Sequence, residues 1–296
     1  MKACIIFNPA ARGEKAERFR HQVGEFCTGA ALKLTTAPGG ARELAAEAVS
    51  EGFNTIIAAG GDGTLNEVLN GVGDEPNGYE RVRLATIPLG TVNVFARQIG
   101  MVSDFRRSWK IIEAGREQRI DLPSARFFAN GKEEDRRFVQ LAGAGWDARA
   151  VEAVSLKLKR KIGQLAYIYA GLRSLAGPQA RIKVQHSGGE ISGELVIIGN
   201  GRFYGGSFPL LPQADYADGL LDVCVFDKVN WLTFPFVGIE LAANMVFRKV
   251  SKHYFRAREL QLSSDTRAAL QLEGEPVGTL PATITVEPKK LRVIVA

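Results

Sequence analysis

The chain has 296 residues, 46% of them hydrophobic and 24% charged, so it is long enough for two compact domains and too apolar for a disordered protein. Its 38 basic and 32 acidic residues give a formal charge of +6, which suits an anionic partner such as a nucleotide or an anionic membrane surface. The cysteines and histidines are scattered, which argues against a disulfide framework and a zinc site and favours a cytoplasmic location: Cys4, Cys27, Cys224, His21, His186 and His253.

The first predicted element is a strand over Lys2–Phe7, which ends too early for the apolar core of a signal peptide. No uncharged apolar run reaches the roughly 18 residues of a transmembrane helix. If the substrate is a lipid, we therefore expect the protein to visit the membrane surface peripherally.

Helices and strands then alternate, which predicts a parallel sheet with crossover helices. The expected elements are a helix over Glu14–Cys27, a strand over Leu32–Thr36, a helix over Ala41–Ser50 and a strand over Asn54–Ala59. Ligands bind such sheets at the carboxyl ends of the strands. The turn Asn8–Gly13 and Thr36 are candidates for that edge, and both also read as ordinary turn residues.

The strand Asn54–Ala59 runs into Gly60-Gly61-Asp62-Gly63, and a helix is predicted over Thr64–Val72. Thr64 and Glu67 match a capping box, which predicts that the helix starts at Thr64. A glycine turn opening a helix suits phosphate because backbone N–H groups point outward and no Cβ blocks the anion. The alternative is a tight turn without a ligand.

A second turn of this kind follows the predicted strand Val82–Ile87, where Gly90-Thr91 again leads into a helix. We therefore expect two helix N-termini to converge on one polyphosphate. A helix over Phe105–Ala114 is the last element of this half of the chain.

From Arg119 onward, short strands separated by Asn-Gly, Gly-Gly and charged turns predict a second, antiparallel domain. The expected strands are Ile120–Leu122, Arg126–Ala129, Arg136–Leu141, Arg181–Gln185 and Glu194–Gly199, and two helices interrupt them, around Ala148–Lys159 and Gly163–Leu175. We expect an α/β protein with an N-terminal doubly wound parallel-sheet nucleotide domain, residues 1–118, and a C-terminal β-rich, β-sandwich-like domain, residues 119–296. The last strands, over Thr283–Pro288 and Leu291–Val295, either rejoin the first domain or pack between the two. The basic run Lys157–Lys161 reads as a solvated helix face or as a membrane-surface patch.

Two acidic motifs complete the candidates. Asp215 and Asp218, with the carbonyl of Leu220, offer hard oxygen ligands for Mg²⁺ or Ca²⁺, although Asp218-Gly219 is equally a plain turn. Glu273-Gly274-Glu275 ends a strand over Leu270–Leu272 and offers two carboxylates.

The run Gly-Gly-Asp-Gly-Thr-Leu-Asn-Glu at residues 60–67 resembles the nucleotide-binding signature of the diacylglycerol kinase catalytic domain, a lipid kinase family that includes sphingosine kinases. Gly-Gly-Asp-Gly alone is shared with NAD kinases and phosphofructokinases. The second run, Pro88-Leu89-Gly90-Thr91-Val92-Asn93, resembles the same family at the spacing that NAD kinases do not normally show. The runs at 199–206, 212–223 and 273–275 extend the resemblance to Glu275.

This resemblance implies an ATP-dependent lipid kinase that transfers the γ-phosphoryl group to a hydroxyl of diacylglycerol or a related lipid, with Mg²⁺ carried by ATP near Asp62. It implies a structural metal at Asp215, Asp218 and Leu220. It also implies a general base at Glu275 with Glu273 as its partner, and Asp62 as a third catalytic candidate. The nucleotide-binding residues it implies are Asn8, Pro9, Arg12, Thr36, Gly60, Gly61, Asp62, Gly63, Thr64, Asn66, Glu67, Gly90, Thr91 and Asn93.

Two positions depart from the family pattern: Arg12 replaces a common Ser, and Glu273 replaces the usual Asp, which lengthens the side chain by one methylene. A kinase of a soluble substrate such as NAD and a nucleotide-binding regulator without catalysis therefore stay open. No motif of a nucleic-acid-binding module is present. The sequence does not choose the lipid, and it leaves a homodimer open.

Overall fold

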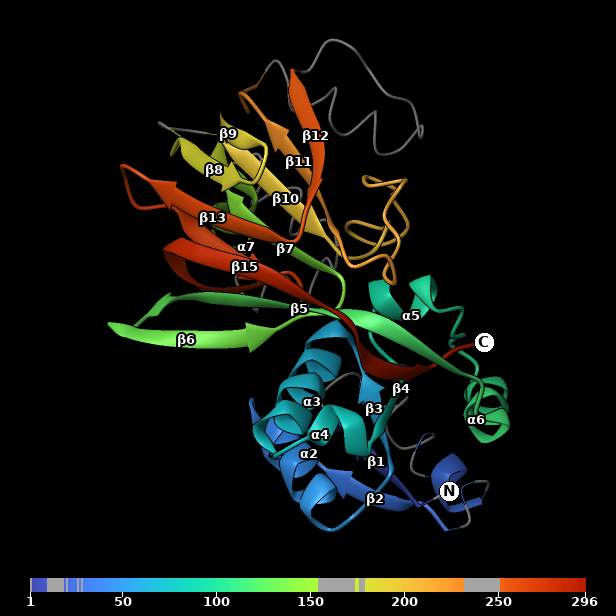
Figure 1. The fold of residues 1–296 in the computed structure, drawn as a ribbon. Coiled ribbons are helices and arrows are strands. Elements are labelled where there is room, and N and C mark those ends of the chain that lie inside the picture. The colour runs from blue at the N-terminus through green and yellow to red at the C-terminus, as the bar shows by residue number, and fades with distance from the viewer. Residues whose placement is uncertain are drawn as a thin grey trace. The chain divides into compact units, whose positions relative to one another are not determined.

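The structure is a computed structural model, and it describes residues 2–9, 19, 21–25, 27, 29–153, 174–175, 179–231 and 251–296. The chain divides into two compact units, one of Met1–Leu122 with Glu287–Ala296 and one of Pro123–Val286. The predicted fold class, a parallel-sheet α/β unit followed by a β-rich unit, is confirmed (Figure 1).

The first unit contains a parallel sheet in the order β4-β3-β1-β2, and Val293 of β15 adds a parallel pairing with Leu84 on the outer side of β4. The described elements are β1 (Ala3–Phe7), β2 (Ala31–Leu34), α2 (Gly40–Ser50), β3 (Thr55–Gly60), α3 (Asp62–Asp74), α4 (Gly78–Arg81), β4 (Arg83–Pro88), α5 (Val94–Gln98) and α6 (Phe105–Ala114).

The central strands β1 and β3 are buried at every residue, as expected for strands of a parallel sheet covered on both faces. Helix α6 spans the predicted residues at both ends. Its N-cap Asp104 accepts a hydrogen bond from the backbone N–H of Arg107 at 2.9 Å, and Gly115 at φ 66° ends the helix in the left-handed conformation.

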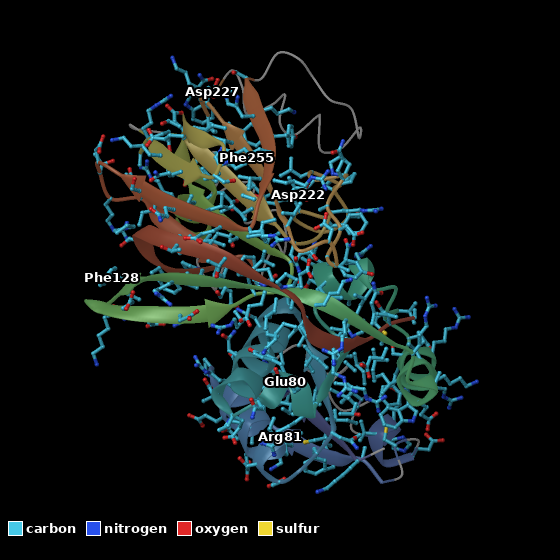
Figure 2. All side chains as sticks on the ribbon, in the orientation of Figure 1. Glu80, Arg81, Phe128, Asp222, Asp227 and Phe255 are labelled. Carbon is cyan, nitrogen blue, oxygen red and sulfur yellow. The ribbon has the colours of Figure 1, made fainter. Side chains whose placement is uncertain are left out.

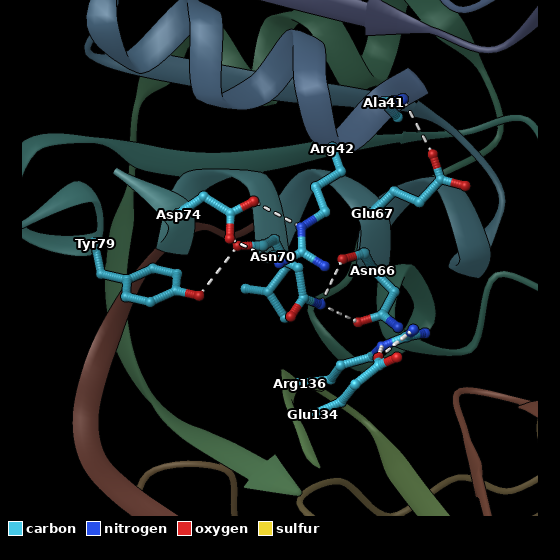
Figure 3. Close-up of polar contacts among 10 residues, drawn as sticks. Ala41, Arg42, Asn66, Glu67, Asn70, Asp74, Tyr79, Glu134 and Arg136 are labelled. Atoms are coloured by element: carbon cyan, nitrogen blue, oxygen red, sulfur yellow. Dashed lines mark hydrogen bonds and ion pairs between the residues drawn. The ribbon is translucent and has the colours of Figure 1, made fainter. Parts of the chain in front are cut away.

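The predicted capping box at Thr64 is wrong. Helix α3 starts at Asp62, and its N-cap is Gly61 in an extended conformation without a side-chain cap. The Glu67 carboxylate instead accepts a hydrogen bond from the backbone N–H of Gly39 at 3.1 Å. It accepts a second one from the backbone N–H of Ala41 at 3.0 Å (Figure 3). Glu67 therefore caps the N-terminus of α2, which lacks a cap from its own N-cap residue.

The second unit is built from two series of strands that share β15. The first series runs β12-β11-β10-β7-β14-β15. The second series runs β15-β13-β8-β9. Its elements are the end of β5 (Glu117–Ala129), β6 (Lys132–Arg137), β7 (Leu141–Gly145), α7 (Trp146–Ala153), β8 (Ile182–His186), β9 (Gly189–Gly193), β10 (Leu195–Gly199), β11 (Leu221–Phe226), β12 (Lys252–Ala257), β13 (Glu259–Ser264), β14 (Ala269–Leu272) and most of β15 (Glu275–Ile294).

Both series contribute side chains to one apolar core, among them Val196, Val223, Leu260, Leu270 and Ile284. A second cluster around Trp146, Ile197 and Phe226 covers the other side of β10 and β11. The arrangement is that of a β-sandwich-like unit.

The structure joins strands that the sequence separates. Ile120–Leu122 and Arg126–Ala129 belong to one strand, β5, and the two expected closing strands are one strand, β15, whose last residues Glu287–Ile294 belong to the first unit. The strand expected over Arg136–Leu141 is divided between β6 and β7. The run Lys157–Lys161 and most of the two helices expected beside it lie outside the described residues, as does most of the helix expected over Glu14–Cys27. Among the described helices, none is long and apolar enough to cross a membrane.

Candidate active site

The candidate nucleotide residues gather at the carboxyl edge of the parallel sheet. Asn8 follows β1, Thr36 lies two residues beyond β2, and Gly61 and Leu89 follow β3 and β4. The chain leaves β1 toward β2 on one side and toward β3 and β4 on the other, so the strand order reverses between β1 and β3. This switch point is where open α/β sheets bind ligands.

Asn8 and Thr64 face each other across that point. The backbone N–H of Asn8 donates to the carbonyl of Ala59 at 3.1 Å, and the Asn8 side-chain amide donates to Thr64 Oγ1 at 3.3 Å. The turn after β1 is thereby tied to the first turn of α3.

The two glycine turns lie against each other, backbone to backbone. The N–H groups of Leu89 and Gly90 donate to the carbonyl of Gly60 at 2.9 and 3.3 Å. A Cβ at Gly90 would lie 2.6 Å from the Cα of Gly61. Only glycine allows this approach, which leaves a surface of backbone without side chains, of the kind that admits a phosphate group.

Asn93 closes the second turn. It has φ 51°, its side-chain N–H donates to the carbonyl of Gly90 at 2.8 Å, and its Oδ1 is buried without a hydrogen-bond partner among the described residues. A buried amide oxygen without a partner is uncommon in proteins, so Asn93 is a candidate for contact with a ligand, an ion or a water molecule.

Asp62 does not point away from the protein. Its carboxylate accepts a hydrogen bond from the backbone N–H of Val94 at 3.2 Å, and it also interacts with the amides of Asn93 and Phe95. Burial raises the pKa of Asp62, and these backbone hydrogen bonds oppose that shift. Asp62 thus caps α5, which has only five residues. The expectation that two helix N-termini converge on one polyphosphate is therefore wrong for α5, because a protein carboxylate already occupies that end. The N-terminus of α3, by contrast, has no side-chain cap.

The other predicted nucleotide residues separate into two groups. Thr36 and Thr91 are exposed, and Pro9 and Gly63 are partly exposed, all near the edge described above. Asn66 accepts hydrogen bonds from the Asn70 side chain through its backbone and side-chain oxygens, at 2.9 and 3.1 Å, and Glu67 caps α2 (Figure 3). Arg12 lies outside the described residues.

Glu273 and Gly274 form the two-residue turn of the hairpin between β14 and β15. Both have positive φ, 54° and 76°, as a type I′ turn requires. A non-glycine residue in this conformation is strained by about 1 kcal/mol or more. The Glu273 carboxylate is held in place, since its Oε1 accepts hydrogen bonds from the N–H groups of Val139 and Gln140, both at 2.7 Å. Glu275 is exposed.

The candidate metal residues form turns. Asp215 Oδ1 accepts from the N–H of Ala217 and Asp218 Oδ1 from that of Leu220, both at 3.0 Å. Asp218 Oδ2 also pairs with Arg256 at 3.2 Å. In the part of the chain that the structure describes, no three His, Cys, Asp or Glu residues are grouped to hold a metal ion. Each ionised carboxylate keeps further lone pairs for a cation, but Arg256 competes for Asp218.

Asp222 lies beside these turns on β11 (Figure 2). It is buried, its Oδ2 has no hydrogen-bond partner within the described chain, and burial raises its pKa to about 6. Sequence reasoning did not single it out.

Sequence reasoning also missed three polar side chains behind the Glu273 hairpin: Asp147 and Gln271, which are buried, and Tyr204, which is partly buried. Asp147 accepts hydrogen bonds from the Tyr204 hydroxyl and from Gln271 Nε2, the latter at 2.8 Å. The available signal was an aspartate directly after the apolar run Leu141–Trp146, where an acidic residue is expensive to bury unless it is paired.

The first unit is thus a parallel sheet with two glycine turns at its switch point, where open α/β sheets bind ligands, and the second is a β-sandwich-like unit. A sequence profile described as the diacylglycerol kinase catalytic domain matches residues 2–125. One described as the YegS C-terminal NAD kinase beta sandwich-like domain matches residues 140–295.

The chain is 32% identical over 292 residues to a protein named diacylglycerol kinase from Staphylococcus saprophyticus, covering 95% of this chain and 90% of the relative. It is 31% identical to the protein of the same name from Staphylococcus aureus MRSA252, covering 95% and 88%. A crystal structure of a diacylglycerol kinase from Bacillus anthracis matches the whole chain and 97% of its own with a TM-score of 0.77 at 24% identity, which bears on the fold alone. The chain belongs to the diacylglycerol kinase family.

Proposed function

We propose that this protein transfers the γ-phosphoryl group of ATP to a hydroxyl of diacylglycerol or a closely related lipid. The observation that carries the proposal is the similarity over 95% of the chain to relatives named diacylglycerol kinase, which spans both units. Phosphoryl transfer depends mainly on positioning and on neutralising charge, and the two units offer groups for both tasks.

The nucleotide is assigned to the carboxyl edge of the first unit. The abutting turns at Gly61 and Gly90 and the uncapped start of α3 receive the phosphates, with Asn8, Thr36, Thr64, Thr91 and Asn93 around them. A divalent cation carried with ATP, Mg²⁺ in this proposal, neutralises phosphate charge when bound. Asp62 supports this site by holding the second turn, and Asn66 and Glu67 support it from within the helix layer.

The base for the lipid hydroxyl is assigned to the hairpin of the second unit. The sequence favours Glu275 because it matches the family pattern, with Glu273 as its partner. The geometry supports the reverse order, because Glu273 is half-buried and fixed by two backbone amides while Glu275 is exposed. A general base must first be held in position. The backbone of Glu273, with its positive φ, is strained, as is typical of a functional residue.

A structural divalent cation at Asp215, Asp218 and the Leu220 carbonyl remains part of the proposal. It would add to the stability of the second unit, in competition with the guanidinium of Arg256. The lipid substrate requires the protein to reach a membrane surface peripherally, and its charge of +6 is compatible with an anionic surface.

A second candidate is phosphorylation of NAD. The observation that favours it is the description of the profile matched by residues 140–295, which names an NAD kinase-like sandwich. The acceptor substrate distinguishes the two candidates, because both use ATP.

The assay that tests the base compares Glu273→Gln with Glu275→Gln in ATP turnover with diacylglycerol in mixed micelles. Gln at 273 keeps an oxygen for the amides of Val139 and Gln140 but removes the basicity, so turnover should fall by about a hundredfold or more while ATP affinity persists. A large loss in Glu275→Gln alone reverses the two roles. If both variants keep most activity, the hairpin does not carry the base.

A further inference from the structure

Behind the hairpin, the buried Asp147 binds Gln271, and Gln271 binds the backbone of the two-residue turn. Asp147 is 5% exposed and Gln271 is 1% exposed, and Gln271 Nε2 donates to Asp147 Oδ2 at 2.8 Å. At its other end, Gln271 Oε1 accepts a hydrogen bond from the backbone N–H of Gly274 at 2.7 Å. One amide side chain therefore connects a buried carboxylate to the centre of the turn that carries Glu273.

The surroundings are shaped for this connection. Gly143 lies opposite Gln271 in the pairing of β7 with β14, and a Cβ there would lie 2.5 Å from both Asp147 Oδ2 and Gln271 Nε2. The Tyr204 hydroxyl donates to the other oxygen of Asp147. Burial raises the pKa of Asp147, and the hydrogen bonds from Tyr204 and Gln271 lower it, so the carboxylate depends on these two donors.

The hairpin needs such support because it is short and strained. Gly274 lies in the two-residue turn, outside the residue pairs that join β14 to β15, the last of which is Leu272 with Glu275. Gln271 Oε1 gives the N–H of Gly274 an acceptor. Only Nε2 of the Gln271 amide can donate to the Asp147 carboxylate, so Asp147 fixes the amide with its Oε1 toward the N–H of Gly274. The Glu273 side chain is fixed separately, through Val139 and Gln140.

We propose that Asp147 is a positioning residue for phosphoryl transfer, acting through Gln271 on the Glu273–Gly274–Glu275 turn. This inference rests on the proposed function, in which that turn carries the base. In this proposal Asp147 does not contact either substrate. It acts by keeping Gln271 Oε1, rather than Nε2, toward the backbone N–H of Gly274.

The connection can be broken at one residue and rebuilt at two. Asp147→Leu removes the acceptor of Gln271 Nε2, so nothing fixes which end of the Gln271 amide faces the N–H of Gly274. If the amide turns over, its NH₂ group meets that N–H, donor against donor. In Asp147→Asn/Gln271→Glu, the carboxylate at 271 accepts from the NH₂ group at 147 and from the N–H of Gly274, and the amide oxygen at 147 accepts from Tyr204, which rebuilds the connection.

The experiment measures kcat and KM for ATP in Asp147→Leu, in Asp147→Asn/Gln271→Glu and in Ser124→Ala. Ser124→Ala removes the contact of Ser124 with Thr285 at 3.0 Å, elsewhere in the same unit, and serves as the control. We expect kcat to fall by about tenfold or more in Asp147→Leu with KM for ATP unchanged, because a misplaced base slows the chemical step. The double variant should recover most of the loss, and the control should match the wild type.

A second readout does not depend on activity. Deuterium uptake at the backbone N–H of Gly274 should be faster in Asp147→Leu and return to the wild-type rate in the double variant. Wild-type kcat in Asp147→Leu, or no recovery of kcat and protection in the double variant, overturns the proposal. If Asp147→Leu does not fold, the double variant alone decides, since wild-type kcat and protection support the proposal and their loss refutes it. Retained activity in both Glu273→Gln and Glu275→Gln marks failure of the proposed base instead, whatever Asp147 does.

Discussion

Asp62→Ala tests whether the aspartate of the first glycine turn holds the fold together or acts only in chemistry. The variant removes the acceptor for the N–H of Val94, a contact of 3.2 Å that also involves the amides of Asn93 and Phe95. These three residues are 7%, 9% and 1% exposed, so water has little access to the amides left behind. Losing a helix cap costs about 1 kcal/mol, and an unsatisfied buried amide about 1–3 kcal/mol, so we expect a loss of about 2 kcal/mol.

For a unit of this size, that loss lowers Tm by about 4–8 °C in thermal unfolding followed by circular dichroism. Asp62→Asn keeps an acceptor oxygen and should lose less. Asp74→Ala is the matched control, because Asp74 belongs to the same helix but pairs with Arg42 at the surface, where ion pairs contribute about 0–1 kcal/mol. A Tm of Asp62→Ala equal to that of Asp74→Ala would refute the assignment of Asp62 as the cap of α5.

Two further predictions concern the neighbouring assignments. Glu67→Ala should destabilise the protein by about 1 kcal/mol, because the amides of Gly39 and Ala41 lose their cap, while ATP affinity measured by calorimetry stays near the wild-type value; a large loss of affinity at unchanged Tm would place Glu67 at the nucleotide instead. Removing divalent cations with EDTA should lower Tm of the wild type but not of Asp218→Ala, and equal shifts in the two proteins would leave Asp215 and Asp218 as turn residues only.

Much of the fold was predictable because it depends on local pattern. The continuous apolar runs of β1 and β3 identify buried parallel strands. Helix α6 was predictable at both ends because its N-cap Asp104 and its terminal Gly115 are local signals. The division of β6 from β7 was not, because the break over residues 138–140 depends on neighbours distant in sequence, among them Glu273, which binds the amides of Val139 and Gln140.

The candidate site shows the same limit. Thr64 and Glu67 satisfy the local capping pattern, but Glu67 finds its partners more than 25 residues earlier in the chain, at Gly39 and Ala41. Likewise, the pattern around Asp62 indicates a phosphate turn, but it cannot show that the carboxylate faces Val94, 32 residues away. Asp147 escaped detection for the same reason, since its donors lie on separate elements.

The measurement that tests the central claim most directly is the transfer of ³²P from γ-labelled ATP to a panel of acceptors. The panel holds diacylglycerol, sphingosine and phosphatidylglycerol in mixed micelles, and NAD in solution. The proposed function predicts labelled lipid, with diacylglycerol as the preferred acceptor, and loss of the label in Glu273→Gln. Label on NAD alone, or tight ATP binding without transfer to any acceptor, would contradict it.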